Sequence, residues 1–133
     1  MGGKVEEMAR KEHWKTEPDQ HDYPAAHDYL TLVMSPAAAS GLVEALKKAP
    51  LMHREAKDLL RASALPLLPE NNYHVAKDLS KVKKGQLLSP VLLVAGDASR
   101  GAPLSIADGY HRICASYFLD EDASIPCRLV DQP

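Results

Sequence analysis

A short segment near the carboxyl end, residues 106–112 (IADGYHR), places an acid, a glycine, a histidine and an arginine at what reads as a helix start. Asp108 is of a type that often caps helices, and Gly109 lets a ligand approach the backbone closely. The free N–H groups of a first helical turn attract anions, as does the helix dipole. Arg112 could grip phosphate oxygens in two places, and His111 could donate a hydrogen bond or move a proton. The segment therefore predicts a phosphate site built from Gly109, Tyr110, His111 and Arg112.

Asp108 complicates this interpretation, because its negative charge would lie beside the bound phosphate. Mg²⁺ between the two would resolve the conflict, since it is commonly held by a carboxylate together with phosphate oxygens. Asp108 is thus a candidate metal ligand and, with His111, a candidate catalytic residue. The alternative is purely structural: Asp108 caps the helix, Gly109 makes the turn, and His111 and Arg112 are solvated. The segment alone leaves both interpretations open.

The whole chain has the size and composition of one folded domain. Its 133 residues suffice for a single compact unit, and an apolar content of 45% supports a buried core. A net charge of -2 argues against a dedicated nucleic-acid binder, although a local DNA contact stays open. No apolar run approaches ~18 residues and no secretory signal is visible, so we expect a cytoplasmic protein without a membrane segment. Cys114 and Cys127 form no zinc pattern and are expected to be reduced core thiols, with a disulfide as the alternative.

The first half of the chain predicts a flexible segment followed by a helical extension. Residues 1–22 are polar and charged, and nothing in them requires a fold. Residues 21–28 (HDYPAAHD) repeat a His-Asp pair, and we expect an irregular loop there because proline breaks helices; a metal site is the alternative. The other expected elements of this half are a strand at residues 29–34, a helix over Ala37–Lys48 that begins at Ser35-Pro36, and a helix over about His53–Ser63.

The second half alternates strands and helices and indicates the fold class. Residues 65–72 (LPLLPENN) are too proline-rich for a central strand and read as an extended crossing segment. A continuous apolar run over residues 90–95 (PVLLVA) is typical of a strand buried on both faces. The remaining expected elements are a helix over Val75–Lys84 ending at Gly85, a strand over Leu104–Ala107, a helix over Gly109–Leu119 and a strand over Ser124–Val130. Together they predict an α+β fold with a small sheet and packed helices.

Three stretches, LLSPVLLV, LSIADGYHRICASYFL and SIPCRLV, resemble the ParB/sulfiredoxin superfamily. The resemblance covers about residues 65–130 of a single domain expected over 23–133, and it implies a small ParB/sulfiredoxin-like sheet with packed helices. The helical extension at about residues 29–64 matches nothing in that family. The elements that carry the resemblance are, in order, Gly85 with Pro90, the turn Gly109–Arg112, Ala115 in the next helix, and Ile125-Pro126 at the last strand.

The resemblance implies a nucleotide ligand for the turn. Sulfiredoxins carry their reacting cysteine where this chain has Tyr110, so sulfiredoxin activity is not expected. Partition-type ParB proteins carry a helix-turn-helix domain after the turn, and the chain is expected to be a standalone member without one. The D-G-x-H-R form is similar to that of ParB-like nucleases and near that of a free-serine kinase that uses ADP. By that resemblance residues 109–112 hold a phosphate of ATP, ADP or CTP, His111 donates to the phosphate or acts as acid or base, and Asp108 contacts Mg²⁺ or substrate.

Two further features bear on the chemistry. A kinase needs an acidic base upstream of the turn, for which Glu70 is a candidate, although it could equally be a turn residue. Lysines follow at positions 77, 81, 83 and 84 and could assist a polyphosphate or nucleic acid; such a run is more often a solvated helix face.

The leading hypothesis is a standalone nucleotide-binding domain that works as a Mg²⁺-dependent phosphotransferase or nucleotide hydrolase. The alternative is a non-catalytic module whose helical extension contacts a protein partner, DNA or a second copy in a homodimer. A ParB-like nuclease stands third, because no carboxylate cluster able to hold two metal ions is visible in the sequence.

Overall fold

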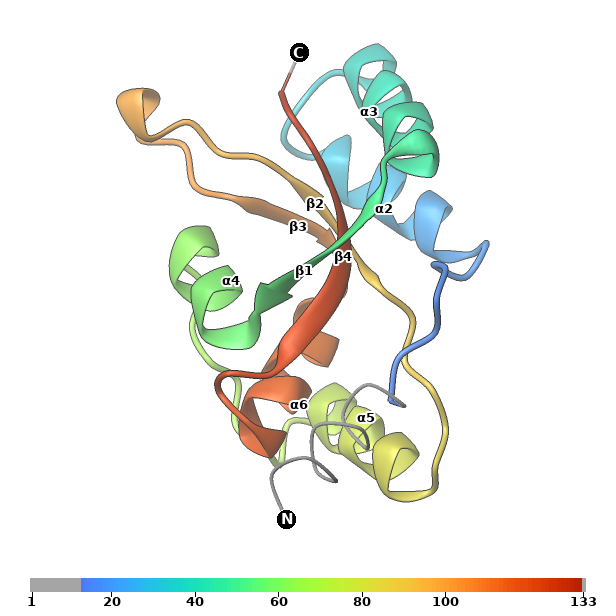
Figure 1. Ribbon diagram of the computed structural model, residues 1–133. Helices are drawn as coiled ribbons and strands as arrows, with labels where there is room; N and C mark the ends of the chain where they lie inside the picture. Colours follow the sequence, from blue (N-terminus) through green and yellow to red (C-terminus); the bar gives the residue numbers. More distant parts are fainter. Residues whose placement is uncertain (1–12, 133) are drawn as a thin grey trace.

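The computed structural model of the protein describes residues 13–132 and is a mixed α+β structure (Figure 1). Helices and strands are interspersed along the chain, and the fold class is the α+β one that the sequence predicts. In chain order they are α2 (Asp22–Leu30), α3 (Pro36–Lys48), β1 (Leu51–Glu55), α4 (Ala56–Ser63), α5 (Tyr73–Lys83), β2 (Val91–Val94), the 3₁₀ turn η1 (Ala98–Arg100), β3 (Ser105–Asp108), α6 (Tyr110–Leu119) and β4 (Ser124–Val130).

The four strands form one sheet in the order β1-β4-β2-β3. β4 runs parallel to β2, whereas the outer pairs β1–β4 and β2–β3 are antiparallel. The two central strands, β2 and β4, are thus neighbours in the sheet although β3 and α6 separate them in the sequence. This order places the end of β3, and hence the start of α6, at one edge of the sheet.

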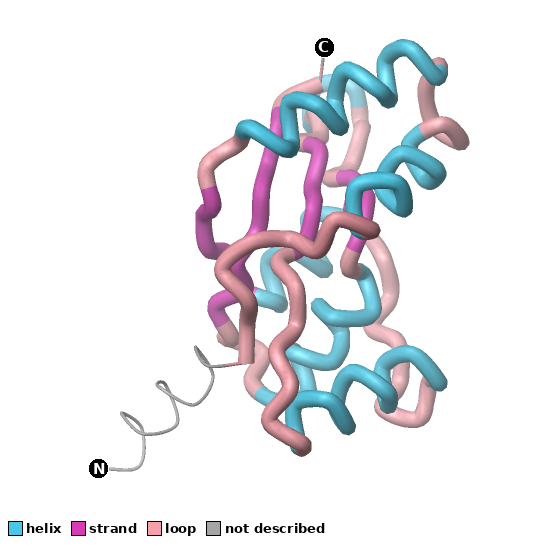
Figure 2. The backbone as a smooth tube through the Cα atoms, turned by 90° about the vertical axis from the view of Figure 1, so that its right-hand side faces the viewer, coloured by secondary structure: helices cyan, strands magenta, loops and turns pink. Residues whose placement is uncertain are grey.

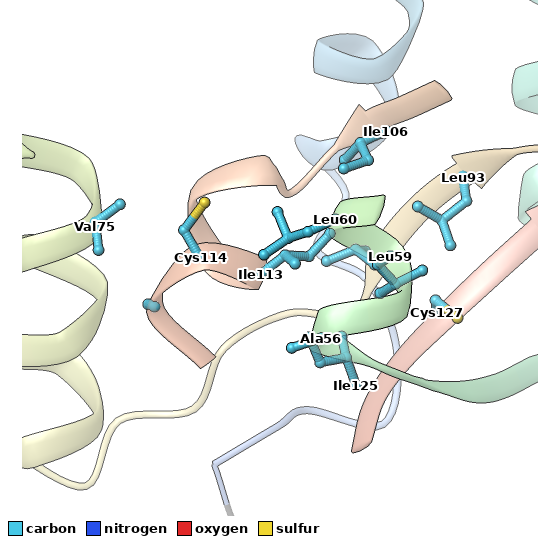
Figure 3. Packing of buried hydrophobic residues seen from close by; sticks show 12 residues of the cluster. Ala56, Leu59, Leu60, Val75, Leu93, Ile106, Ile113, Cys114, Ile125 and Cys127 are labelled. Carbon is cyan, nitrogen blue, oxygen red and sulfur yellow. The ribbon is translucent and has the colours of Figure 1, made fainter. Parts of the chain in front are cut away.

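Helices cover both faces of the sheet (Figure 2). Along β2, Val91 and Leu93 point to the face covered by α4, α5 and α6, where they pack with Ile113 and Ile125 (Figure 3). Leu92 and Val94 belong instead to a second buried cluster under α2 and α3. Because successive strand residues point to opposite faces, a strand covered on both sides needs an unbroken apolar run. That is the physical reason for the sequence VLLV.

The expected start of α3 is confirmed in detail. The side chain of Ser35 accepts a hydrogen bond from the Ala38 N–H at 3.2 Å, and proline occupies the first helical position. At the other end, Nη1 of Arg128 on β4 donates to the carbonyl of Leu46 at 3.2 Å. These contacts satisfy backbone groups that a helix leaves unpaired at its two ends. α3 is thereby fixed to the sheet.

The segment before α3 contradicts two expectations. Residues 21–28 are not an irregular loop and residues 29–34 are not a strand, because α2 spans Asp22–Leu30 and a turn follows it. Pro24 lies in the first helical turn, where its missing N–H would have no partner anyway. Tyr23, Ala26 and Leu30 recur at helical spacing and are buried against the sheet. That spacing indicates a helix, and the helix continues to Leu30 although β-forming residues begin at position 29.

A strand replaces the first turns of the helix expected at His53–Ser63. Residues 51–55 form β1, which pairs with β4 so that Arg54 lies opposite Ile125, and α4 begins only at Ala56. The partner strand lies about seventy residues later in the chain. Local periodicity cannot report such a pairing, since β structure depends on neighbours rather than on intrinsic preference.

The N-terminal segment and the cysteines complete the fold. Residues 1–12 of the segment expected to be flexible lie outside the described residues, while Trp14 pairs with Leu88 just before β2.

Cys114 and Cys127 are buried and free, as expected, and burial raises the pKa of the Cys127 thiol to about 11. Among residues 13–132, no helix is both long and apolar enough to cross a membrane.

Candidate functional site

The turn between β3 and α6 depends on the glycine at position 109. Gly109 is the N-cap of α6 with φ of 115°, a backbone conformation that side chains rarely adopt. A Cβ added there would clash with Cγ1 of Val91 on β2 and would lie 3.0 Å from Nη2 of Arg112. The close approach of the strand thus excludes any larger residue, independently of a ligand.

Asp108 does not cap α6, which corrects the sequence-based prediction. It is the last residue of β3, one place before the N-cap, and no side chain in the described part of the chain caps this helix. The N–H groups of the first turn, including those of Tyr110 and His111, are therefore left without a side-chain acceptor. An anion is the partner that such a helix start favours.

Asp108 is instead paired with Arg112, one helical turn later. Nη2 of Arg112 donates to Oδ2 of Asp108 at 2.9 Å and to the carbonyl of Pro90 at 3.3 Å, and both side chains are largely buried. Nε of Arg112 is buried without a partner among residues 13–132. Nη2 of the guanidinium is thus committed to the fold, whereas Nε and Nη1 take no part in these two hydrogen bonds.

A second carboxyl group, on α2, meets Asp108 from the other side. Asp22 is almost fully buried, with 2% of its surface exposed. Burial raises the pKa of Asp108, the nearby Arg112 works against that rise, and the Asp22 carboxyl adds to it. Two neighbouring carboxyl groups hold a proton or a cation more readily than an isolated one. Sequence analysis placed Asp22 in a His-Asp repeat but did not connect it to Asp108, because only the fold brings α2 to this turn.

Asp22 also belongs to a group of possible metal ligands. Nε2 of His21 lies 3.4 Å from Oδ1 of Asp22 and 4.0 Å from Oδ2 of Asp19, and one ligand atom of each residue lies within 4.8 Å of the others. The first His-Asp pair of the sequence thus fits the metal alternative. The second pair does not join it, since His27 lies 3.1 Å from the hydroxyl of Ser40 on α3.

Two adjoining pockets surround these groups. One, of about 210 Å³, lies between α5 and the start of α6, and the other, of about 450 Å³, opens on the side of the N-terminal segment. Asp78, Lys81 and Arg112 line both and form the wall between them. The smaller pocket is lined by His74, Lys77, Asp78, Lys81, Asp108, Gly109, His111 and Arg112.

α5 contributes one polar face to the smaller pocket. Its residues His74, Lys77, Asp78 and Lys81 follow one another at three- and four-residue spacing, which places them on one side of a helix. Two lysines of the expected solvated face therefore line a pocket. Lys83 lines a different one, beside Phe118 and Leu119. The spacing was visible in the sequence, but which face α5 turns toward α6 was not.

The acid–base groups of the smaller pocket have shifted pKa values. Burial lowers the pKa of His111, and the neighbouring His74, whose ring centre is 4.6 Å away, lowers it further. Burial also raises the pKa of Asp78, against the opposing effect of Arg112. Neutral His111 is thus favoured at neutral pH, where it can accept a proton.

Two other residues point elsewhere. The hydroxyl of Tyr110 donates to the carbonyl of Pro66, so its side chain fastens the crossing segment rather than facing the pocket. Glu70, the candidate base, lines the separate pocket beside Phe118. The structure therefore brings together Asp108, Gly109, His111 and Arg112, uses only the backbone of Tyr110, and leaves Glu70 outside.

Comparisons with known proteins do not add a relative to this picture. No family model matches the chain, and neither a curated protein nor a solved structure matches it. The resemblance to the ParB/sulfiredoxin superfamily accordingly stays a prediction, and the function must be argued from the site itself.

Proposed function

We propose that the pocket between α5 and α6 binds the phosphate groups of a nucleotide. The observation that carries this proposal is the convergence of an uncapped helix start with Lys77 and Lys81 on one small pocket. The helix start offers N–H donors, and the lysines offer positive charge. Arg112 offsets the charge of Asp108 at 2.9 Å, so that this carboxylate repels a phosphate less than an unpaired one would.

The lysines supply most of the expected affinity. Hydrogen bonds to charged groups contribute about 1.5–3 kcal/mol each, whereas a helix start contributes about 0.3–1 kcal/mol at an exposed site. Arg112 adds less than a free arginine would, because its Nη2 already serves Asp108 and Pro90. The phosphate would therefore lie between α5 and the turn, rather than in a clamp made by Arg112 alone.

Catalysis at this pocket would use His111 as the acid–base group. Its lowered pKa leaves it neutral at neutral pH, ready to take a proton from an attacking water or hydroxyl group. This fits a phosphotransferase or nucleotide hydrolase of the ParB/sulfiredoxin-like type, with ATP, ADP or CTP as the nucleotide. Measured hydrolysis or transfer of a nucleotide phosphate would distinguish such an enzyme from a protein that only binds nucleotides.

Asp22 and Asp108 are the residues that would hold Mg²⁺. Both offer carboxylate oxygens, the ligands that this ion prefers, and the Asp22 carboxyl group lies close enough to raise the pKa of Asp108. When bound, the ion would neutralise phosphate charge. The neighbouring group with His21 suits a transition metal better, because imidazole nitrogen is a softer ligand.

A calorimetric titration tests the proposal with a control from the same helix. ATP, ADP, CTP and GTP are titrated into the wild type with and without Mg²⁺, then into Lys77→Ala/Lys81→Ala and into Lys83→Ala/Lys84→Ala. We expect micromolar to millimolar binding of at least one nucleotide, weakened at least about tenfold in the first double variant and unchanged in the second. Equal weakening in both, or no binding to the wild type, would contradict the proposal.

A metal-dependent nuclease is the second candidate, favoured by one observation that the sequence did not show. Asp19, His21 and Asp22 form a group of possible metal ligands that lines the larger pocket, and the carboxyl group of Asp108 interacts with that of Asp22. Carboxylates and an imidazole can hold metal ions that activate water against a phosphodiester. Cleavage of a single-stranded oligonucleotide in Mn²⁺, abolished by Asp22→Asn, would favour this candidate over nucleotide turnover.

A further inference from the structure

Aromatic rings line the rim of the phosphate pocket. The ring of His111, in the first turn of α6, lies 4.6 Å from that of His74, in the first turn of α5. The ring of His74 in turn lies 5.2 Å from that of Tyr73, which is oriented edge-to-face to it. A continuous row of rings thus leads from a pocket-lining histidine outward to Tyr73.

The fold does not account for Tyr73. It belongs to neither buried cluster, and 73% of its surface is exposed, whereas α5 is anchored through its buried residues Val75 and Val82. Asn72 caps α5 by accepting hydrogen bonds from the His74 and Val75 N–H groups, so the helix start does not require the tyrosine ring either. An exposed aromatic ring beside a polar pocket is a common feature of sites that bind bases.

We propose that Tyr73 and His74 form a stacking surface for the base of a nucleoside di- or triphosphate. This inference rests on the proposed function, because it places the base relative to a phosphate held between α5 and α6. The phosphates enter the pocket at Lys77, Lys81 and the α6 start, the ribose crosses its rim, and the base lies on the exposed ring of Tyr73. Tyr110 also lies beside His111, with 5.7 Å between the ring centres, but it packs against the core cluster and its hydroxyl is bonded to the Pro66 carbonyl.

The chemistry of the surface fixes the kind of selectivity. Stacking uses the π-face that every base has, and it distinguishes bases weakly compared with hydrogen bonds to base edges. The surface therefore selects nucleotides over inorganic polyphosphates and sugar phosphates, and it discriminates little between ATP and CTP. That preference for a base is the measurable consequence of the arrangement.

The test compares ligands that share phosphates and differ in the base. ATP, CTP and inorganic tripolyphosphate are titrated calorimetrically into the wild type, Tyr73→Ala, Tyr73→Phe and Tyr29→Ala, a control at another exposed tyrosine. We expect the wild type to prefer both nucleotides over tripolyphosphate by at least about fivefold. Tyr73→Ala should abolish that preference and leave tripolyphosphate affinity unchanged, while Tyr73→Phe and Tyr29→Ala should keep it.

The outcomes separate the stacking surface from the pocket. Equal affinity of the wild type for nucleotides and tripolyphosphate would overturn the stacking surface and leave the phosphate pocket standing. A preference that survives in Tyr73→Ala would overturn it too. Failure of every ligand to bind would overturn both. As a second readout, ATP but not tripolyphosphate should shift the ring proton resonances of Tyr73 in NMR spectra.

Discussion

The starts of α3 and α6 solve the same problem in different ways. At α3, the side chain of Ser35 accepts from the Ala38 N–H, and proline, which has no N–H, fills the first helical position, so fewer donors are left open. At α6, a glycine with positive φ holds the cap position and no described side chain accepts from the first turn. The first start needs nothing from outside the chain. The second is left open toward a pocket lined by lysines, which is why we place the ligand there.

The largest expected effect is the loss of stability when Gly109, at the start of α6, is replaced. Gly109→Ala forces a side chain into a disfavoured φ and against Val91, and should lower the free energy of unfolding by about 3 kcal/mol or more. Gly85→Ala is the matched control, because Gly85 has φ of 78° but nothing within 4 Å of an added Cβ. It should cost only about 1 kcal/mol. Urea unfolding measures both, and equal losses would show that the contact with Val91 does not matter.

The next largest effect concerns Arg112, which lines the pocket and also makes hydrogen bonds that hold the turn. Arg112→Gln leaves the largely buried carboxyl group of Asp108, which also lies near Asp22, without its cation and should lower the free energy of unfolding by about 2–3 kcal/mol. Asp108→Asn in the same chain should recover part of that loss. A double-mutant cycle in urea measures the coupling. Additive losses would mean that the pair does not stabilise the turn.

This expectation changes how Arg112 variants are interpreted. The sequence alone suggests that replacing Arg112 would remove ligand binding and leave the fold intact. In the structure, the guanidinium is bonded to Asp108 and to the Pro90 carbonyl, so a loss of binding could follow from a loss of structure. The lysines of α5 give the cleaner test.

The smallest effect is a pH dependence of binding. Burial lowers the pKa of His111, and a bound phosphate would favour the protonated ring, so binding takes up a proton. Affinity for a phosphate ligand should therefore rise, by up to a few-fold, as pH falls below the ordinary value of 6.5. His74, Asp78 and Arg112 also face this ring and affect its pKa. The contribution of His111 is the difference between the pH dependence of affinity in the wild type and that in His111→Gln. Identical pH profiles of the two proteins would contradict the prediction.

What the sequence could predict was local. The Ser35-Pro36 start, the apolar run of β2 and the glycine turn before α6 are each encoded by adjacent residues, and each is found in the structure. β1 was missed because it exists only through its pairing with β4. α2 was missed because Pro24 was given the weight of a helix breaker, although it lies in the first turn.

The site follows the same rule. The four residues from Gly109 to Arg112 come together because they are consecutive, and the structure adds what lies against them. Asp22 arrives from α2, and His74 arrives from α5. Neither contact could be read from one sequence, since both depend on how helices dock on opposite sides of the sheet. Asp108 fails to cap α6 for a local reason: it lies one residue before the N-cap and pairs with Arg112, four residues later.

The most direct test of the open helix start is NMR titration of assigned backbone amides with tripolyphosphate. We predict that the amide resonances of Tyr110 and His111 shift on binding, together with residues of α5 around Lys77, while the capped Ala38 amide of α3 does not. Saturable binding without shifts at Tyr110 and His111 would contradict the account, because the ligand would then lie somewhere other than the start of α6.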